Sequence, residues 1–239
     1  MTIGTLFGVG VGPGDPQLMT FKAASILQRA PVIAYVVDEK GDSFARQVAA
    51  VHIPASTLEL PLRFSMSPQR ERRLIARREA ARRLLEHLSA GQDVAFITEG
   101  DPLLYSTFQH ILLALPPEAP VEICPGVSSV FASAAAAHFP LALENQGMVI
   151  ASASQARPEQ IQAWLEQFEV IVLFKVFRSL GPLVEMLEQT GCLEGAMLVE
   201  KASLQDEVVI HDLSAWDGRQ PAYFSLLLIR GKGTITSLE

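Results

Sequence analysis

The sequence predicts an α/β fold divided into two α/β domains. Short apolar runs alternate with amphipathic stretches along all 239 residues, which is the order typical of strands and helices packed in layers. A proline-rich segment, PPEAP at 116–120, interrupts this alternation near the middle of the chain. With 49% hydrophobic and 19% charged residues, the composition is that of a globular protein with a sizeable core. We therefore expect one domain at 1–120 and a second at 121–239.

The first domain is expected to alternate buried strands with amphipathic helices. Asp15 and Pro16 are typical of a helix N-cap and first turn, and Gly91 is typical of a helix C-terminus. The predicted strands are 5–11, 31–37 and 93–98, and the predicted helices are 15–30, 67–91 and 103–115.

The second domain is expected to begin with a short strand and a tight turn in 121–129. The last two apolar runs, 207–216 and 222–233, are predicted to form an antiparallel pair. Between these segments the predicted helices are 128–139, 158–168 and 179–191, and the predicted strands are 147–152, 170–176 and 195–202.

Charge and composition exclude several classes of partner. The net charge of −7 argues against general nucleic-acid binding. No basic segment precedes an apolar run at the N-terminus, and the most apolar stretch, 130–143, is too short and too interrupted to span a bilayer. Cys124 and Cys192 lie far apart, and the five histidines form no metal-binding pattern. We expect a cytoplasmic protein with buried thiols, no membrane contact and no bound metal.

The glycine-rich opening segment GVGVGPGDP, residues 8–16, looks like a nucleotide-binding loop but fits neither template. A dinucleotide fingerprint needs a third glycine where Pro13 or Asp15 stands, and a P-loop needs a Gly-Lys-Ser/Thr sequence that the chain lacks. Asp15 also places a carboxylate where a phosphate needs amide donors. The segment therefore predicts close backbone approach to a ligand other than a diphosphate.

Three glycine corners are predicted at the ends of strands, and we define them as residues 10–16, 98–106 and 125–129. Ligands of open α/β sheets gather where strands end and the chain turns into helices. Three such corners favour one shared cleft, although each corner taken alone is more typical of a simple tight turn.

Eight arginines lie between Arg63 and Arg83, with only Glu71 and Glu79 among them. In an acidic protein, such a segment suggests a polyanionic small molecule. The alternative is a solvated helix face, because the arginines from Arg70 onward are distributed around most of the predicted helix. Arg63, beside the start of that helix, is the preferred candidate for an anionic ligand.

Taken together, the three corners carry a more specific signal. The set of GVGPGDP, GDPLLYS and PGVSS, in this order and spacing, resembles the tetrapyrrole (corrin/porphyrin) methylase family over essentially the whole chain. The segments LFGVGVGPGDP, GDPLLYSTF and YFSLLLIR are most similar to the branch of precorrin-2 and cobalt-factor II C(20)-methyltransferases.

This resemblance implies two α/β domains with the active-site cleft between them, occupied by S-adenosyl-L-methionine. Phe177 replaces a glycine of the family pattern at one edge of that site. The implied substrate residues, on the tetrapyrrole side, are Gly12, Pro13, Gly14, Asp15 and Arg63. The implied cofactor residues are Gly100, Asp101, Leu104, Tyr105, Ser128, Ser129, Val176, Ala202, Phe224 and Ser225.

The resemblance further implies methylation of the C-20 meso carbon of precorrin-2 or cobalt-factor II in cobalamin biosynthesis, by a homodimer. Methyl transfer from a sulfonium requires mainly alignment. The methylated carbon must then lose a proton, and Tyr105 and Asp101 are the candidate bases.

Other hypotheses stay open at this point. A methylase of the same family acting on a different corrin position is one of them. A dinucleotide-dependent reductase with an altered fingerprint and a non-catalytic binding module are alternatives from other classes. The sequence pI of about 5.3 disfavours an RNA substrate.

Overall fold

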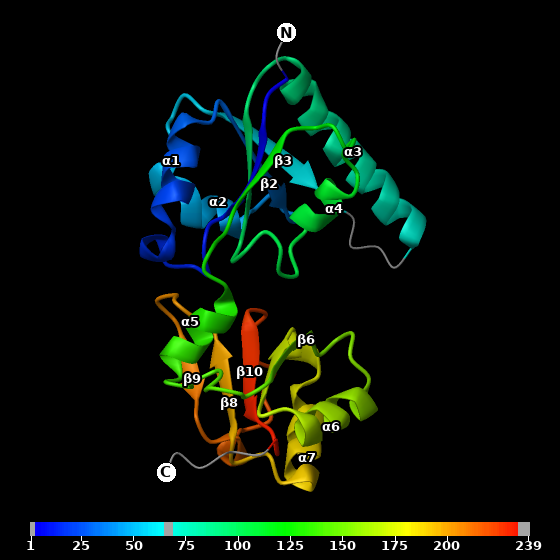
Figure 1. Ribbon diagram of the computed structural model, residues 1–239. Helices are drawn as coiled ribbons and strands as arrows, with labels where there is room; N and C mark the ends of the chain where they lie inside the picture. The colour runs from blue at the N-terminus through cyan, green and yellow to red at the C-terminus, as the bar shows by residue number, and fades with distance from the viewer. Residues whose placement is uncertain (1–2, 65–68, 234–239) are drawn as a thin grey trace. The chain divides into compact units, whose positions relative to one another are not determined.

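The computed structural model of the protein describes residues 3–64 and 69–233. The chain forms two compact units, Met1–Ser128 and Ser129–Glu239, and each contains a five-stranded sheet with its own helices (Figure 1). The predicted α/β class is confirmed. The sequence placed the division after residue 120, whereas the first unit continues to Ser128, because β5 (Val121–Cys124) pairs with the first strand of the chain.

The sheet of the first unit has the strand order β3-β2-β4-β1-β5. Neighbouring strands pair in parallel, so all five end along the same edge, which we call the carboxyl edge. The loops that leave this edge are therefore brought together from distant parts of the chain. Besides β5, the strands are β1 (Leu6–Gly10), β2 (Val32–Val37), β3 (Leu58–Arg63) and β4 (Val94–Thr98).

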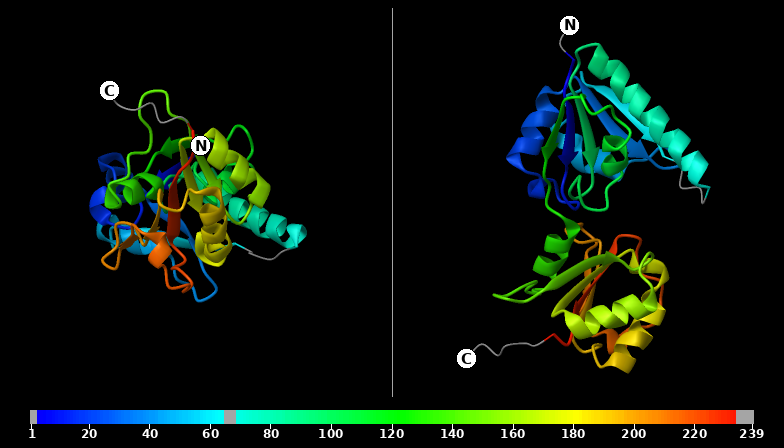
Figure 2. Two further views of the ribbon diagram at one scale, coloured as in Figure 1. Left: turned by 90° about the horizontal axis from the view of Figure 1, so that it is seen from below. Right: turned by 45° about the vertical axis from the view of Figure 1, so that its right-hand side comes forward.

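Helices cover both faces of this sheet (Figure 2). Every residue of β1 and β4 is buried, which is the pattern of strands covered on both sides. Alternate side chains of β1 enter different cores: Val9 packs with α1 and α2, whereas Leu6 packs with α3 and α4. The helices are α1 (Phe21–Arg29), α2 (Phe44–Ala49), α3 (Arg70–Ser89) and α4 (Phe108–Leu112).

The single helix predicted for 15–30 is wrong in its first third. Asp15 does act as a cap, since its Oδ1 accepts a hydrogen bond from the amide N of Gln17 at 2.8 Å, but it caps only a 3₁₀ turn at Pro16–Leu18. The α-helix begins after Thr20, whose hydroxyl accepts from the amide N of Ala23 at 3.1 Å. A second cap thus starts a separate helix five residues later.

The helix predicted for 103–115 is also shorter in the structure, where α4 spans only Phe108–Leu112. Tyr105 has a φ of 54°, which is incompatible with a right-handed helix. The short helix α2 and the edge strand β3 were not predicted at all. Within the described residues, no helix combines the length and the apolar character needed to cross a bilayer.

The sheet of the second unit is mixed, with the strand order β6-β7-β10-β8-β9. β6 and β7 are parallel, while β10 runs antiparallel to both β7 and β8. On one face of this sheet pack α6 (Pro158–Gln167) and α7 (Leu180–Thr190), and α5 (Ser129–Ala136) contacts β10. The strands are β6 (Met148–Ser152), β7 (Val170–Phe174), β8 (Ala196–Glu200), β9 (Val208–Ile210) and β10 (Ser225–Arg230).

The predicted pairing of the last two apolar runs is wrong. β9 and β10 each pair with β8, on opposite sides, and not with each other. Five of the six residues of β10 are buried, so this strand belongs in the middle of the sheet, whereas the three residues of β9 are partly exposed and suit an edge. The strand ends that carry the candidate site are adjacent because β10 lies between β7 and β8.

Candidate functional site

The three glycine corners meet at the carboxyl edge of the first sheet. The amide N of Gly100 donates to the carbonyl O of Gly12 at 2.8 Å, and the reciprocal bond measures 3.4 Å. A Cβ atom at Gly126 would lie 2.1 Å from the carbonyl O of Gly100, and one at Gly10 would lie 2.4 Å from the same atom. The three backbones are thus in direct contact, and Gly10 and Gly126 leave no space for any side chain.

Asp101 holds two of these corners together. Its Oδ2 accepts from the amide N of Gly126 at 3.1 Å, and its Oδ1 accepts from the amide N of Leu103 at 2.8 Å. The side chain therefore fixes the central corner against the corner that follows β5. Because each carboxylate oxygen has two lone pairs, both retain the capacity to accept from a ligand.

Tyr105 lies in the central corner with a 46% exposed side chain and a left-handed backbone, φ 54°. Such a conformation costs energy for any residue other than glycine and clusters at functional sites. The neighbouring Ser106 holds the turn in place: its Oγ lies 2.9 Å from Oγ1 of the buried Thr98 and accepts from the amide N of Phe108 at 3.1 Å. Leu104, beside Tyr105, is half-buried.

The opening corner contributes mainly backbone to this edge. Gly12, with a φ of 83°, and Gly14 are buried, whereas Pro13 and Asp15 are half-buried. The Asp15 carboxylate caps the following 3₁₀ turn. The structure therefore gives Asp15 a local structural contact that any functional test must separate from ligand binding.

In the second unit, the predicted cofactor residues gather where β7 and β8 end and β10 begins. Val176 and Ala202 follow β7 and β8, and Phe224 and Ser225 lead into β10. The carbonyl O of Phe224 accepts from the amide N of Lys201 at 2.7 Å. Val176 and Ser225 are buried, whereas the Phe224 side chain is 43% exposed.

Two further properties mark this group of strand ends. Lys175, Lys201 and Ser203 all have left-handed backbones, with φ values of 58°, 53° and 67°. The Ser225 hydroxyl is a buried polar atom without a hydrogen-bond partner among the described residues. Buried hydroxyls normally have a partner, so the strained turns and the unpaired Ser225 Oγ both point to a polar ligand.

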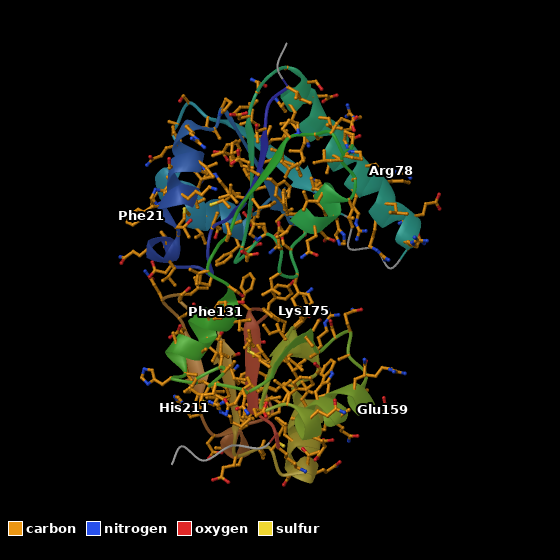
Figure 3. All side chains as sticks on the ribbon, in the orientation of Figure 1. Phe21, Arg78, Phe131, Glu159, Lys175 and His211 are labelled. Carbon is orange, nitrogen blue, oxygen red and sulfur yellow. The ribbon has the colours of Figure 1, made fainter. Side chains whose placement is uncertain are left out.

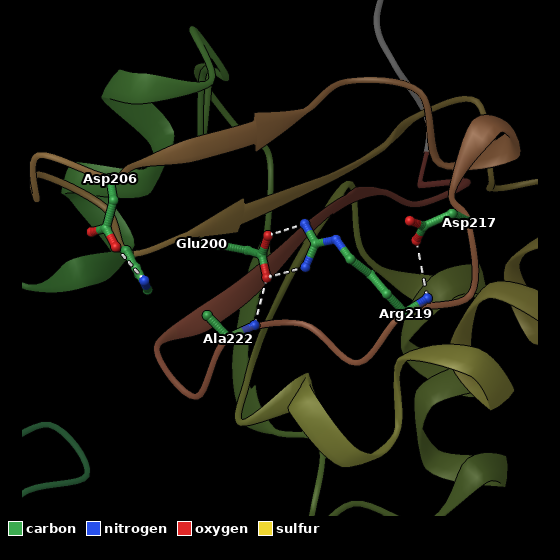
Figure 4. A network of polar contacts seen from close by, with 6 residues as sticks. Glu200, Asp206, Asp217, Arg219 and Ala222 are labelled. Carbon is green, nitrogen blue, oxygen red and sulfur yellow. Dashed lines mark hydrogen bonds and ion pairs between the residues drawn. The ribbon is translucent and has the colours of Figure 1, made fainter.

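An ion pair that the sequence analysis missed fixes the loop before β10 (Figure 4). The Glu200 carboxylate is buried at the end of β8 and accepts hydrogen bonds from both Nη1, at 3.0 Å, and Nη2 of Arg219. It also accepts from the amide N of Ala222 at 2.5 Å. The Arg219 guanidinium holds the pKa of Glu200 below its ordinary value. No sequence motif marks a contact between residues 19 positions apart.

The loop held by this ion pair carries an aromatic group. The ring of Tyr223 lies 5.1 Å from that of Phe177 and 5.2 Å from that of Phe224, measured between centroids. Phe177, which departs from the family pattern, therefore belongs to the same cluster as the predicted Phe224.

The predicted substrate residue Arg63 ends β3 at the carboxyl edge. Its side chain is exposed and its Nη1 donates to the carbonyl O of Glu39 at 3.4 Å. On α3, Arg82 forms ion pairs with Glu79 and Glu86, as expected for a solvated helix face. Ser128 and Ser129, the remaining predicted residues, are the last residue of the first unit and the first residue of the second.

Comparison with known proteins adds an independent observation. A sequence model of the family described as Tetrapyrrole (Corrin/Porphyrin) Methylases matches residues 5–215. The chain belongs to the tetrapyrrole methylase family. The match includes the three glycine corners and the ends of β7 and β8, and it stops before β10.

Individual members of the tetrapyrrole methylase family match nearly the whole chain. The cobalt-precorrin-2 C(20)-methyltransferase of Salmonella typhimurium is 34% identical, covering 95% of this chain and 96% of that protein. The precorrin-2 C(20)-methyltransferase of a Sinorhizobium species is 30% identical, covering 96% of each. The cobalamin biosynthesis protein CobIJ of Mycobacterium bovis is 34% identical over 95% of this chain, which spans only 46% of that longer protein.

Solved structures of tetrapyrrole methylases share the fold. A cobalt precorrin-4 methyltransferase, CbiF, has a TM-score of 0.72 at 23% identity, covering 95% of this chain and 94% of that one. The uroporphyrin-III C-methyl transferase of Thermus thermophilus, complexed with S-adenyl homocysteine, has a TM-score of 0.66 at 25% identity, covering 95% and 92%.

Proposed function

We propose that the chain is an S-adenosyl-L-methionine-dependent methyltransferase that methylates the C-20 meso carbon of precorrin-2 or cobalt-factor II in cobalamin biosynthesis. The observation that carries this proposal is the contact of the three glycine corners, all of which lie within the residues that the tetrapyrrole methylase model matches. The names of the Salmonella and Sinorhizobium relatives support the position of methylation and the substrate class.

The residues present fit this cofactor on two structural grounds. S-adenosyl-L-methionine has no phosphate, so it needs backbone groups and a few polar atoms and not an anion cradle. The glycine corners bring backbone groups together at the carboxyl edge, and Ser225 Oγ is a buried polar atom without a partner among the described residues. In this proposal the residues that bind the cofactor are Gly100, Asp101, Tyr105, Val176, Phe224 and Ser225.

When bound, the cofactor supplies a methyl group already activated on a sulfonium. The residues of the chain then have to align this donor with the substrate carbon and exclude water, and alignment alone lowers a barrier by about 7–11 kcal/mol in favourable cases. Tyr105 and Asp101 are the proposed acceptors of the proton lost from the methylated carbon. Tyr105 has the more exposed side chain, whereas both oxygens of Asp101 hold the corners in place.

The test of the function is incubation with methyl-labelled cofactor and each of the two substrates, followed by NMR location of the new methyl group at C-20. Labelling at another carbon would indicate a different member of the family. Thermal stabilisation by NAD(P) but not by S-adenosyl-homocysteine would favour a reductase, and tight cofactor binding without transfer would favour a binding module.

We also propose that the enzyme acts in the cytoplasm as a homodimer. The two cysteines are free and buried, which suits a reducing compartment. Light scattering after size-exclusion chromatography should give twice the 26.0 kDa mass of the chain. A monomer at micromolar concentration would contradict the assembly without affecting the proposed chemistry.

Replacing Ser225 by alanine should have opposite effects on binding and stability. Loss of one hydrogen bond to the cofactor is expected to raise the Kd of S-adenosyl-homocysteine about three- to ten-fold. The melting temperature of the ligand-free chain should stay constant or rise, because the variant removes a buried hydroxyl that lacks a partner. Calorimetry and thermal denaturation measure the two effects; an unchanged Kd would remove Ser225 from the cofactor site.

Asp15 variants separate capping from substrate binding. Asp15→Ala should impair tetrapyrrole binding or turnover while leaving the affinity for S-adenosyl-homocysteine within a few-fold, because the opening corner is assigned to the substrate. Asp15→Asn is the control: asparagine caps as well as aspartate, so it keeps the bond to Gln17 while removing the charge. Selective loss of cofactor binding would show that the corner serves the other ligand.

A further inference from the structure

A pocket of about 330 Å³ lies at the β2–β3 end of the carboxyl edge of the first unit. It is at the small end of the range for ligand pockets. The buried side chains of its lining, Val37, Leu62 and Ala80, are apolar, and we call them its floor. The lining also contains two arginines, Arg63 from β3 and Arg83 from α3. Besides these arginines, its lining consists of Val37, Gly41, Pro61, Leu62, Glu79 and Ala80.

The two guanidinium groups are positioned by backbone carbonyls. Arg83 Nη1 donates to the carbonyl O of Pro61 at 2.9 Å, and Arg63 Nη1 donates to that of Glu39 at 3.4 Å. Among the described residues, neither arginine forms an ion pair with a carboxylate. Each guanidinium has five N–H donors, so each has donors left for an anion.

The one acidic side chain in the lining is paired with Arg82, which also pairs with Glu86, and the two arginines of the pocket outnumber it. Glu79 accepts from Arg82 at both carboxylate oxygens, Oε1 at 2.6 Å and Oε2 at 2.9 Å. The charge left at the pocket is therefore positive, although the chain as a whole carries −7. Two arginines above an apolar floor match a carboxylate on a short aliphatic arm.

The position of the pocket on the sheet indicates the size of a ligand that reaches it from the glycine corners. Val37 pairs with Arg63 at the ends of β2 and β3, and Gly10 pairs with Thr98 at the ends of β1 and β4. From β1 to β3 is three strand spacings, about 14 Å. One ligand that contacts both the glycine corners and this pocket must therefore be large, as a ring with side arms is, and a small metabolite cannot bridge them.

We propose that this arginine pocket, with Arg83 as the residue not identified from the sequence, binds a carboxylate-bearing arm of the substrate rim. This inference rests on the proposed function, since it assigns an arm of the proposed tetrapyrrole to a subsite. The contact is remote from the reacting carbon and is made equally before and during methyl transfer. Its loss therefore raises KM and leaves kcat almost unchanged.

A binding experiment tests the pocket without enzyme activity. Propionate is titrated into the full chain while the guanidinium Nε–H signals are followed by NMR, with Arg63→Lys and Arg83→Lys used to assign the two signals. Both signals should shift in a saturable way, and propionate should bind more tightly than acetate because its extra methylene contacts the apolar floor. Absence of a shift at Arg83, or binding of inorganic phosphate but not of propionate, overturns the proposal.

Steady-state kinetics with the tetrapyrrole provides the second test. Arg83→Ala should raise KM about ten-fold, as expected for one charge-assisted hydrogen bond, and Arg83→Lys serves if the alanine variant does not fold. Glu79→Gln should lower KM about two-fold by removing the negative charge from the lining. The matched control is Arg78→Ala, on the same helix and exposed outside the lining (Figure 3), which should leave KM unchanged.

The outcomes separate this proposal from the proposed function. Equal KM changes for Arg83→Ala and Arg78→Ala would mean that the arginines act only through overall charge, and the pocket assignment would fail while the methyltransferase stands. Saturable propionate binding in a chain that methylates neither substrate would overturn the function and leave an aliphatic carboxylate site at Arg83.

Discussion

Replacing Gly100 by valine is expected to abolish binding of S-adenosyl-homocysteine. Gly100 has a φ of 61°, which a β-branched residue adopts only with strain, and its backbone contacts Gly12, Gly10 and Gly126. The new side chain would also occupy the space assigned to the cofactor. Isothermal calorimetry measures the affinity, and circular dichroism verifies that the variant is folded.

Gly191→Val is the matched control for this variant. Gly191 also has a left-handed backbone, φ 71°, but it ends α7 and has no atom within 4 Å of a Cβ position. The control should therefore lose about 1–2 kcal/mol of stability and keep normal cofactor affinity. Near-normal affinity in a folded Gly100→Val variant would refute the placement of the cofactor at the central corner.

The second large effect is expected at Arg219. Arg219→Ala leaves the Glu200 carboxylate buried without its cation, which should lower the free energy of unfolding by about 2–4 kcal/mol. This expected loss of unfolding free energy is smaller than that for breaking a fully buried ion pair, because the Arg219 side chain is 43% exposed. Affinity for S-adenosyl-homocysteine should fall as well, since Arg219 fixes the loop that carries Phe224.

The pH dependence of this variant follows from the pKa of Glu200. The pair lowers that pKa from its ordinary value of 4.5, so its stabilisation is complete above pH 4.5 and disappears as the pH falls through the lowered value. The stability difference between the wild type and Arg219→Ala should therefore be largest near pH 7 and shrink in acid. Urea denaturation at several pH values measures it.

Arg82→Ala is the control for Arg219→Ala. Arg82 also bonds to carboxylates, those of Glu79 and Glu86, but all three side chains are more than half exposed. Exposed pairs contribute little, so the free energy of unfolding should change by less than about 1 kcal/mol. Equal losses at Arg82 and Arg219 would show that burial of Glu200 is not what makes its ion pair strong.

The sequence by itself determined those elements that a pattern of a few neighbouring residues predicts. Continuous apolar runs gave β1, β4, β7 and β10, because strands covered on both faces need such runs. The glycine corners were identified for a similar reason: Gly10 and Gly126 stand where the backbone of another corner excludes any Cβ atom. These restrictions act residue by residue and are therefore visible in the sequence.

Long-range packing decided the features that the sequence analysis missed or misplaced. β10 inserts between β7 and β8, although the neighbouring apolar run made a hairpin with β9 the simpler prediction. Similarly, Asp15 caps only a 3₁₀ turn and the helix starts after a second cap, Thr20, in the register that packs Ala23, Ile26 and Leu27 into the core.

The candidate site divides in the same way. The types of residue at the strand ends, and hence the family and its cofactor, were evident from the sequence alone. The ion pair of Glu200 with Arg219 and the meeting of Arg63 with Arg83 at one pocket required the tertiary structure. These contacts join segments that are far apart in the sequence, and no periodic pattern of residues predicts them. The segments come together only through the packing of the sheets and helices.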